Sequence, residues 1–63
     1  MNNKEYVQAI NIVAHETKII RECMDKIENM TRASSIAVYQ QIIDKSRERV
    51  QYFEDMMHDY ESY

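Results

Sequence analysis

The sequence contains neither glycine nor proline, and cysteine occurs once, as Cys23. The absence of glycine and proline disfavours sheets with tight turns, phosphate-binding loops and flexible linkers. A single cysteine excludes a disulfide within the chain, and the N-terminus has no apolar signal segment; together they predict a reducing, cytoplasmic setting. No apolar run approaches the roughly 18 residues that a membrane-spanning helix needs.

The overall composition is typical of one small domain. The chain has 63 residues, a net charge of −3 and 44% apolar residues, so we expect a single domain over residues 1–63. A domain of this size buries little of its surface, and oligomerisation or a partner is the expected source of further stability. The negative net charge mildly disfavours a general nucleic-acid binder.

Apolar residues recur with the spacing of helices that pack on other helices. In the first half of the chain this stripe consists of Tyr6, Ile10, Val13, Thr17, Ile20, Met24 and Ile27. In the second half it consists of Ile36, Tyr39, Ile43, Ser46, Val50, Phe53, Met57 and Tyr60. We therefore predict two helices, at about 3–29 and 34–60.

The expected helix ends carry residues that favour capping. Asn2 followed by Glu5 indicates a capping box for the first helix. Ser34 or Ser35 is the expected N-cap of the second helix. The two stripes are out of phase, which disfavours the alternative of one continuous helix. We expect an all-α fold, an antiparallel two-helix hairpin that turns between residues 29 and 34.

Folding at this turn pairs the two stripes along their length. Ile10 is expected to face Phe53, and Met24 to face Tyr39. The polar residues Thr17 and Ser46 meet in one layer, which is a common way to fix the register of two helices. Beside this layer, Glu16 and Arg49 are expected to form an ion pair between the helices.

Each predicted helix also carries a second apolar row. This row consists of Ala9, Ile12, Ile19, Cys23 and Met30 in the first helix, and of Val38, Ile42, Tyr52, Met56 and Tyr63 in the second. Both rows fall on the same side of an antiparallel hairpin, so they merge into one apolar flank of the kind that marks an interface. We expect it to pair two copies into a four-helix bundle. A foreign protein is the alternative occupant.

Two groups of charged residues are further candidates for binding. An acidic group follows the last basic residue and is interleaved with aromatic residues, which favours a basic partner; it consists of Glu54, Asp55, Asp59 and Glu61. A basic group near the middle of the hairpin consists of Lys18, Arg21 and Arg47. The plan of an acidic, dimerising hairpin is similar in architecture to Rop, the plasmid RNA-binding four-helix bundle, and this resemblance implies an RNA-binding role for the basic group.

The pattern of reactive residues disfavours catalysis. His15 and His58 fall on outer faces of different helices, and Cys23 has no histidine on its own face. We expect no metal site, no cofactor and no enzymatic activity. The leading hypothesis is a small cytoplasmic regulator or inhibitor that binds a protein target through helical surfaces, in keeping with a compact bacterial or phage accessory protein. The alternatives are a Rop-like dimeric RNA binder and a structural oligomer or assembly adaptor.

Overall fold

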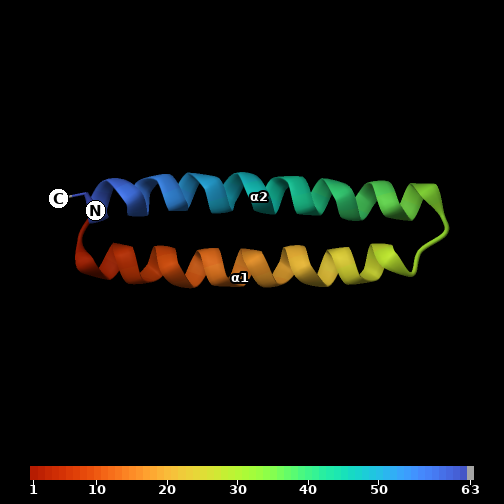
Figure 1. The fold of residues 1–63 in the computed structure, drawn as a ribbon, viewed down its shortest axis with the longest axis horizontal. Coiled ribbons are helices and arrows are strands. Elements are labelled where there is room, and N and C mark those ends of the chain that lie inside the picture. Colours follow the sequence, from red (N-terminus) through yellow and green to blue (C-terminus); the bar gives the residue numbers. More distant parts are fainter. Residues whose placement is uncertain (63) are drawn as a thin grey trace.

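A computed structural model describes residues 1–62, which form two antiparallel α-helices joined by a short turn (Figure 1). Helix α1 spans Asn3–Glu28 and helix α2 spans Ala33–Glu61. The hairpin is a rod of 47 × 14 × 13 Å, with both chain ends at one end and the turn at the other. The predicted two-helix hairpin is therefore confirmed. Among the described residues, neither helix has the length and apolar content needed to cross a membrane.

The N-terminus of α1 is capped as the sequence predicts. The Asn2 side chain accepts a hydrogen bond of 2.8 Å from the backbone N–H of Glu5, which satisfies one of the N–H groups that a helix start leaves without a partner. The predicted N-cap of α2, Ser34 or Ser35, was wrong. Its N-cap is Arg32, whose side chain forms no capping hydrogen bond within the described chain. Since the backbone N–H of Ile36 bonds the Arg32 carbonyl, the helix already begins ahead of the two serines.

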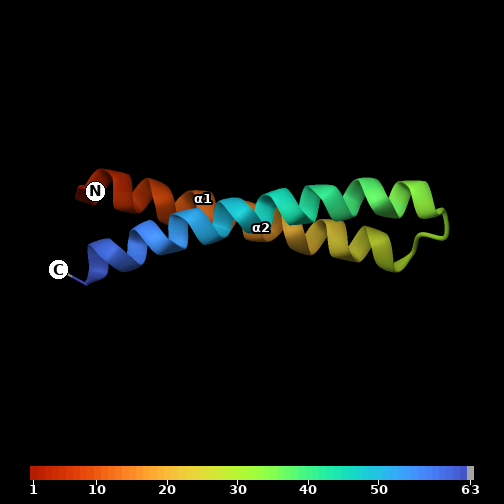
Figure 2. The same ribbon diagram turned by 90° about the horizontal axis from the view of Figure 1, so that it is seen from above.

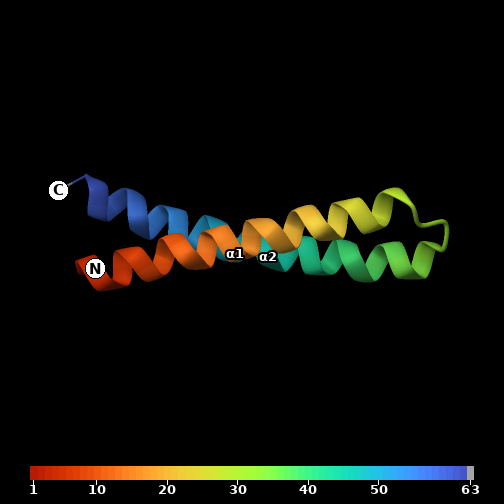
Figure 3. The ribbon, with the colours of Figure 1, turned by 90° about the horizontal axis from the view of Figure 1, so that it is seen from below.

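The contact stripe of α2 is the one expected from the sequence. Ile43 and Ser46 are buried between the helices, and the other members of the stripe are at least half-buried. The two helices lie against each other along the rod and cross near its middle, as the two views along the other axis show (Figures 2 and 3). The heptad spacing of α2 therefore identifies its inner face correctly.

The contact stripe of α1 differs from the prediction in every second position. Four of the seven predicted members do lie at least half-buried in the contact: Tyr6, Val13, Ile20 and Ile27. Ala9, Glu16 and Cys23 take the other three positions, and Met30 extends the stripe. The predicted residues Ile10 and Met24 are instead 41% and 48% exposed.

The rotation of α1 has a physical reason in the size and polarity of the residues that it buries. Ala9 is only 1% exposed and Cys23 only 6%, and such small side chains let two helix backbones approach closely. The rotation also brings the Glu16 carboxylate to within 3.1 Å of the Arg49 guanidinium. Thr17 lies outside the contact, where its hydroxyl donates to the Val13 carbonyl of its own helix. The polar layer therefore pairs Ser46 with Glu16, and not with Thr17.

Candidate interaction surfaces

A buried polar cluster lies at mid-length of the hairpin, where α1 and α2 cross. Glu16 is 5% exposed and Ser46 is 4% exposed. The Glu16 Oε1 atom accepts a hydrogen bond of 3.1 Å from Nη1 of Arg49, whose side chain stays 64% exposed. The predicted interhelical ion pair is confirmed. The second carboxylate oxygen, Oε2, is covered and has no partner with hydrogen-bond geometry among the described residues.

The surroundings of Glu16 favour its ionised form. The Ser46 hydroxyl, which can rotate toward the carboxylate, is the main cause that lowers the pKa of Glu16, while burial acts in the opposite direction and Arg49 adds to the lowering. Burial of the carboxylate opposes this lowering, and the hydrogen bonds and the Arg49 charge together outweigh it. The cluster is therefore a buried, neutralised polar layer, a feature that commonly fixes helix register.

The predicted apolar flank exists, but some of its expected members lie elsewhere. Ala9 and Cys23 are buried between α1 and α2, so the prediction that they face a partner is corrected: the rotation of α1 has placed them in the contact. Met30 is half-buried in the same contact. The rest of the predicted flank has its larger side chains at least partly uncovered: Ile12, Ile19, Val38, Ile42, Tyr52 and Met56. Tyr63 lies outside the described residues.

We name the core of this surface the isoleucine flank, defined by Ile12, Ile19, Ile42 and Met56. Along its edge, Val38 is 56% exposed and Tyr52 is 61% exposed. The ring of Tyr52 meets that of Phe53 edge-on, with centroids 5.2 Å apart. Ile42 is 38% exposed, whereas Ile12, Ile19 and Met56 have only a minor part of their surface uncovered. An apolar face with uncovered side chains along one line is typical of an interaction surface.

A second apolar surface, which the sequence reasoning missed, lies on the opposite side of the contact. We name it the Met24 flank, defined by Val7, Ile10 and Met24, which are 54%, 41% and 48% exposed. The available signal was that the first helix has more apolar residues than one contact stripe can hold. Sequence reasoning placed Ile10 and Met24 in that stripe because they fit the heptad spacing of the large apolar residues, with Thr17 filling the one long step.

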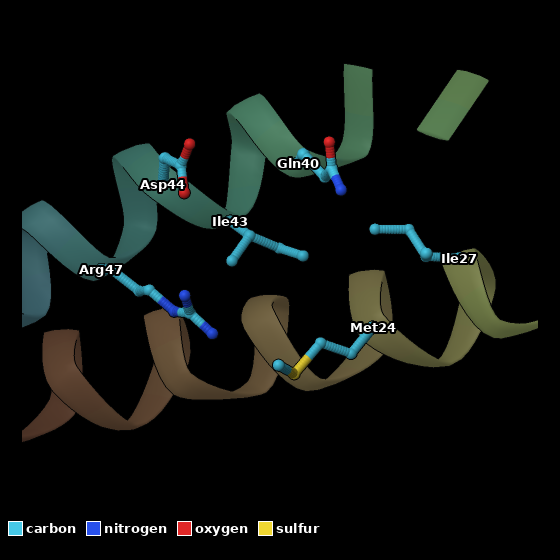
Figure 4. Close-up of a pocket in the computed structure, with 6 residues that line it drawn as sticks. All are labelled: Met24, Ile27, Gln40, Ile43, Asp44 and Arg47. Atoms are coloured by element: carbon cyan, nitrogen blue, oxygen red, sulfur yellow. The ribbon is translucent and has the colours of Figure 1, made fainter. Parts of the chain in front are cut away.

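The Met24 flank contains an open hollow of about 370 Å³ (Figure 4). Met24 and Ile27 of α1 and Ile43 of α2 form its apolar floor. Arg47 reaches from α2 toward α1, whereas Asp44 points outward (Figure 4). A hollow of this size has room for one apolar side chain, and the Arg47 guanidinium lies at its edge.

All four residues of the predicted acidic group are exposed, and two of them accept side-chain hydrogen bonds. Glu61 accepts a hydrogen bond from the Tyr6 hydroxyl, which raises the pKa of Tyr6. Asp55 accepts a hydrogen bond of 2.8 Å from the Gln51 side chain. Asp59 lines a small hollow with Met1, Met56 and Tyr60. Glu54 is exposed.

Aromatic stacking also ties this end of the rod together. The rings of Tyr6 and Tyr60 stack with centroids 4.7 Å apart, and the Tyr60 hydroxyl donates to the Asn3 side chain. These contacts join the start of α1 to the last turn of α2. Part of the acidic end is therefore held in place by the fold, so it is more than a solvated tail.

The members of the predicted basic group differ in their surroundings. Lys18 pairs with Glu22 at 4.0 Å, where both side chains are largely exposed; such pairs contribute little stability. Arg47 borders the hollow of the Met24 flank, and neither Arg47 nor Arg21 forms an ion pair within residues 1–62. Arg47 is therefore the member of the group that lies directly at a candidate surface.

The described residues offer no cluster of metal ligands. Within residues 1–62, no three histidine, cysteine, aspartate or glutamate side chains lie close enough together to hold one ion. His15 and His58 are exposed.

Comparison with protein-family models, with curated proteins and with solved structures finds no match to this chain. Function must therefore be inferred from the surfaces themselves.

Proposed function

We propose that this protein is a small, non-enzymatic regulator or inhibitor that binds a protein target through the surface of its helices. The observation that supports this is the large apolar side chains left uncovered on both flanks of a hairpin whose helices already pack together, among them Ile10, Met24 and Ile42. Each of the two surfaces then has its own occupant. The isoleucine flank pairs two copies into a four-helix bundle, and the Met24 flank receives the target.

The chemistry of the Met24 flank favours an amphipathic target segment with acidic residues. Met24 is flexible and polarizable, so it adapts to different apolar side chains. Arg47 borders the hollow, and Arg21 lies one turn before Met24 on α1. The proposed target segment inserts an apolar side chain between Met24 and Ile43 and places a carboxylate next to a guanidinium, an arrangement that arginine suits well.

A matched pair of variants tests this assignment. Met24→Glu places a carboxylate in the hollow, and Gln41→Glu places one on the exposed outer face of α2 as a control. Each protein serves as bait in a host lysate. Candidate targets are the proteins that the wild type and Gln41→Glu retain but Met24→Glu loses. Direct binding of each purified candidate is then measured by calorimetry. An introduced carboxylate beside buried apolar surface is expected to weaken that binding at least tenfold.

The result that contradicts the assignment is equal binding by all three baits. Recovery of structured RNA instead, with an affinity that falls steeply as salt rises, would favour the Rop-like alternative. Two observations make that alternative the weaker one. The net charge is −3, and the Lys18 ammonium is already paired with the Glu22 carboxylate.

A further inference from the structure

The isoleucine flank has a symmetric pattern along α1. Four residues spaced at seven-residue intervals follow this side of the helix: Glu5, Ile12, Ile19 and Lys26. Read in the reverse direction, the row has the same apolar centre and opposite charges at its ends. A row of this kind is complementary to a reversed copy of itself, which is the condition for a two-fold symmetric interface.

The part of α2 on the same flank is symmetric as well. Ile42 and Met56 lie seven residues before and after Arg49, which is two helical turns or about 10 Å on either side. Arg49 is joined to Glu16 of α1 at 3.1 Å. Glu16 is the fourteenth of the 26 residues of α1, and Arg49 the seventeenth of the 29 of α2. The centres of both rows therefore lie near mid-length of the rod.

The exposed area of the hairpin fits an interface of ordinary size. The chain exposes 5052 Å², whereas a compact protein of 7.6 kDa exposes about 4,300 Å². The excess of about 750 Å² is close to the roughly 800 Å² that each partner buries in a typical stable interface. The radius of gyration, 14.4 Å, also exceeds the roughly 11 Å of a compact chain of this length. A second copy alongside would reduce both departures.

We propose that two copies associate antiparallel through the isoleucine flank, with the two-fold axis beside the Glu16–Arg49 pair. This inference rests on the proposed self-association and specifies its geometry. Each α1 packs against α1 of the second copy, so that Ile12 meets Ile19, and Glu5 comes next to Lys26. Each α2 packs against α2 of the second copy, so that Ile42 meets Met56.

The charges on the flank select this arrangement over the parallel one. Arg49 of each copy lies next to the axis, where two like charges would repel, but the Glu16 carboxylate at 3.1 Å neutralises each of them. In a parallel dimer α1 would lie over α2, with Ile12 near Met56, and Glu5 would have no opposite charge facing it.

Disulfide trapping with mixed variants tests the geometry. Cys23 is first replaced by alanine, and single cysteines are introduced as Ile42→Cys, Met56→Cys or Ile12→Cys. A disulfide needs Cα atoms within about 7 Å. Mixing Ile42→Cys with Met56→Cys under mild oxidation should give the mixed disulfide dimer as the main product. Mixing Ile12→Cys with Met56→Cys should give little, because the antiparallel arrangement separates these positions.

The reverse result, with trapping of position 12 to 56 and not of 42 to 56, would overturn the antiparallel geometry and establish the parallel one. Sedimentation equilibrium of the untrapped Cys23→Ala chain separates the other outcomes. A dimer that forms neither disulfide would use another face, which refutes the inference but leaves self-association standing. A monomer at about millimolar concentration would refute both.

Discussion

Replacing Ala9 by leucine tests the helix contact that the structure defines. Ala9 is 1% exposed, and the facing helix leaves no space for an isobutyl group in place of its methyl group. Leucine and alanine have similar helix propensity, so the change acts through packing. Adding this much volume to a packed contact costs about 1–3 kcal/mol. For a chain of this size each kcal/mol lowers the melting temperature by about 4–8 °C.

The control for this prediction is Ala14→Leu, the same change at an exposed position of the same helix. It should alter the free energy of unfolding by no more than about 0.5 kcal/mol. Thermal unfolding is followed by far-ultraviolet circular dichroism, with both variants and the wild type at one protein concentration because self-association shifts the transition. The expected order is Ala9→Leu well below the other two proteins.

Replacing Ile10 by alanine completes this test. A fully buried isoleucine loses about 2–5 kcal/mol on truncation to alanine. Since Ile10 is 41% exposed, the expected loss is about 1–2 kcal/mol, scaled to its buried part. A wild-type melting temperature for Ala9→Leu, together with a loss of 3 kcal/mol or more for Ile10→Ala, would refute the structural contact and restore the stripe inferred from the sequence.

Two further predictions concern charged groups. The pKa of Glu16 is lowered from 4.5, so its contribution to stability is present above that pH and is lost as the pH falls through the lowered folded-state value. The difference in unfolding free energy between wild type and Glu16→Gln should therefore shrink on titration from about pH 6 to pH 2. A difference that stays constant over this range would refute the pairing. At the C-terminal end of α2, Asp59→Lys should raise the free energy of unfolding by about 0.3–1 kcal/mol because a cation there suits the helix dipole. Glu61→Lys should raise the unfolding free energy by less than Asp59→Lys, or lower it, because it removes the acceptor of the Tyr6 hydroxyl. Equal gains for the two variants in chemical denaturation would argue against that hydrogen bond.

The sequence by itself determined the hairpin and most of its inner faces. Two heptad stripes that do not continue each other are sufficient to predict two helices and a turn. The stripe of α2, the Asn2 cap and the Glu16–Arg49 ion pair also followed from spacing alone. These features depend on residues close in the chain, or on one matching pair, so the periodicity of the sequence contains them.

Only the tertiary structure decided how far α1 is rotated about its own axis. Spacing permits either Ile10 and Met24 or Ala9 and Cys23 beside the shared positions, and the larger apolar side chains favour the first pair. The packed hairpin takes the second, because small side chains allow the helices to approach and because Arg49 and Ser46 accommodate the Glu16 carboxylate. That rotation is a property of two surfaces in contact. It creates the Met24 flank on one side of the contact and leaves the isoleucine flank on the other.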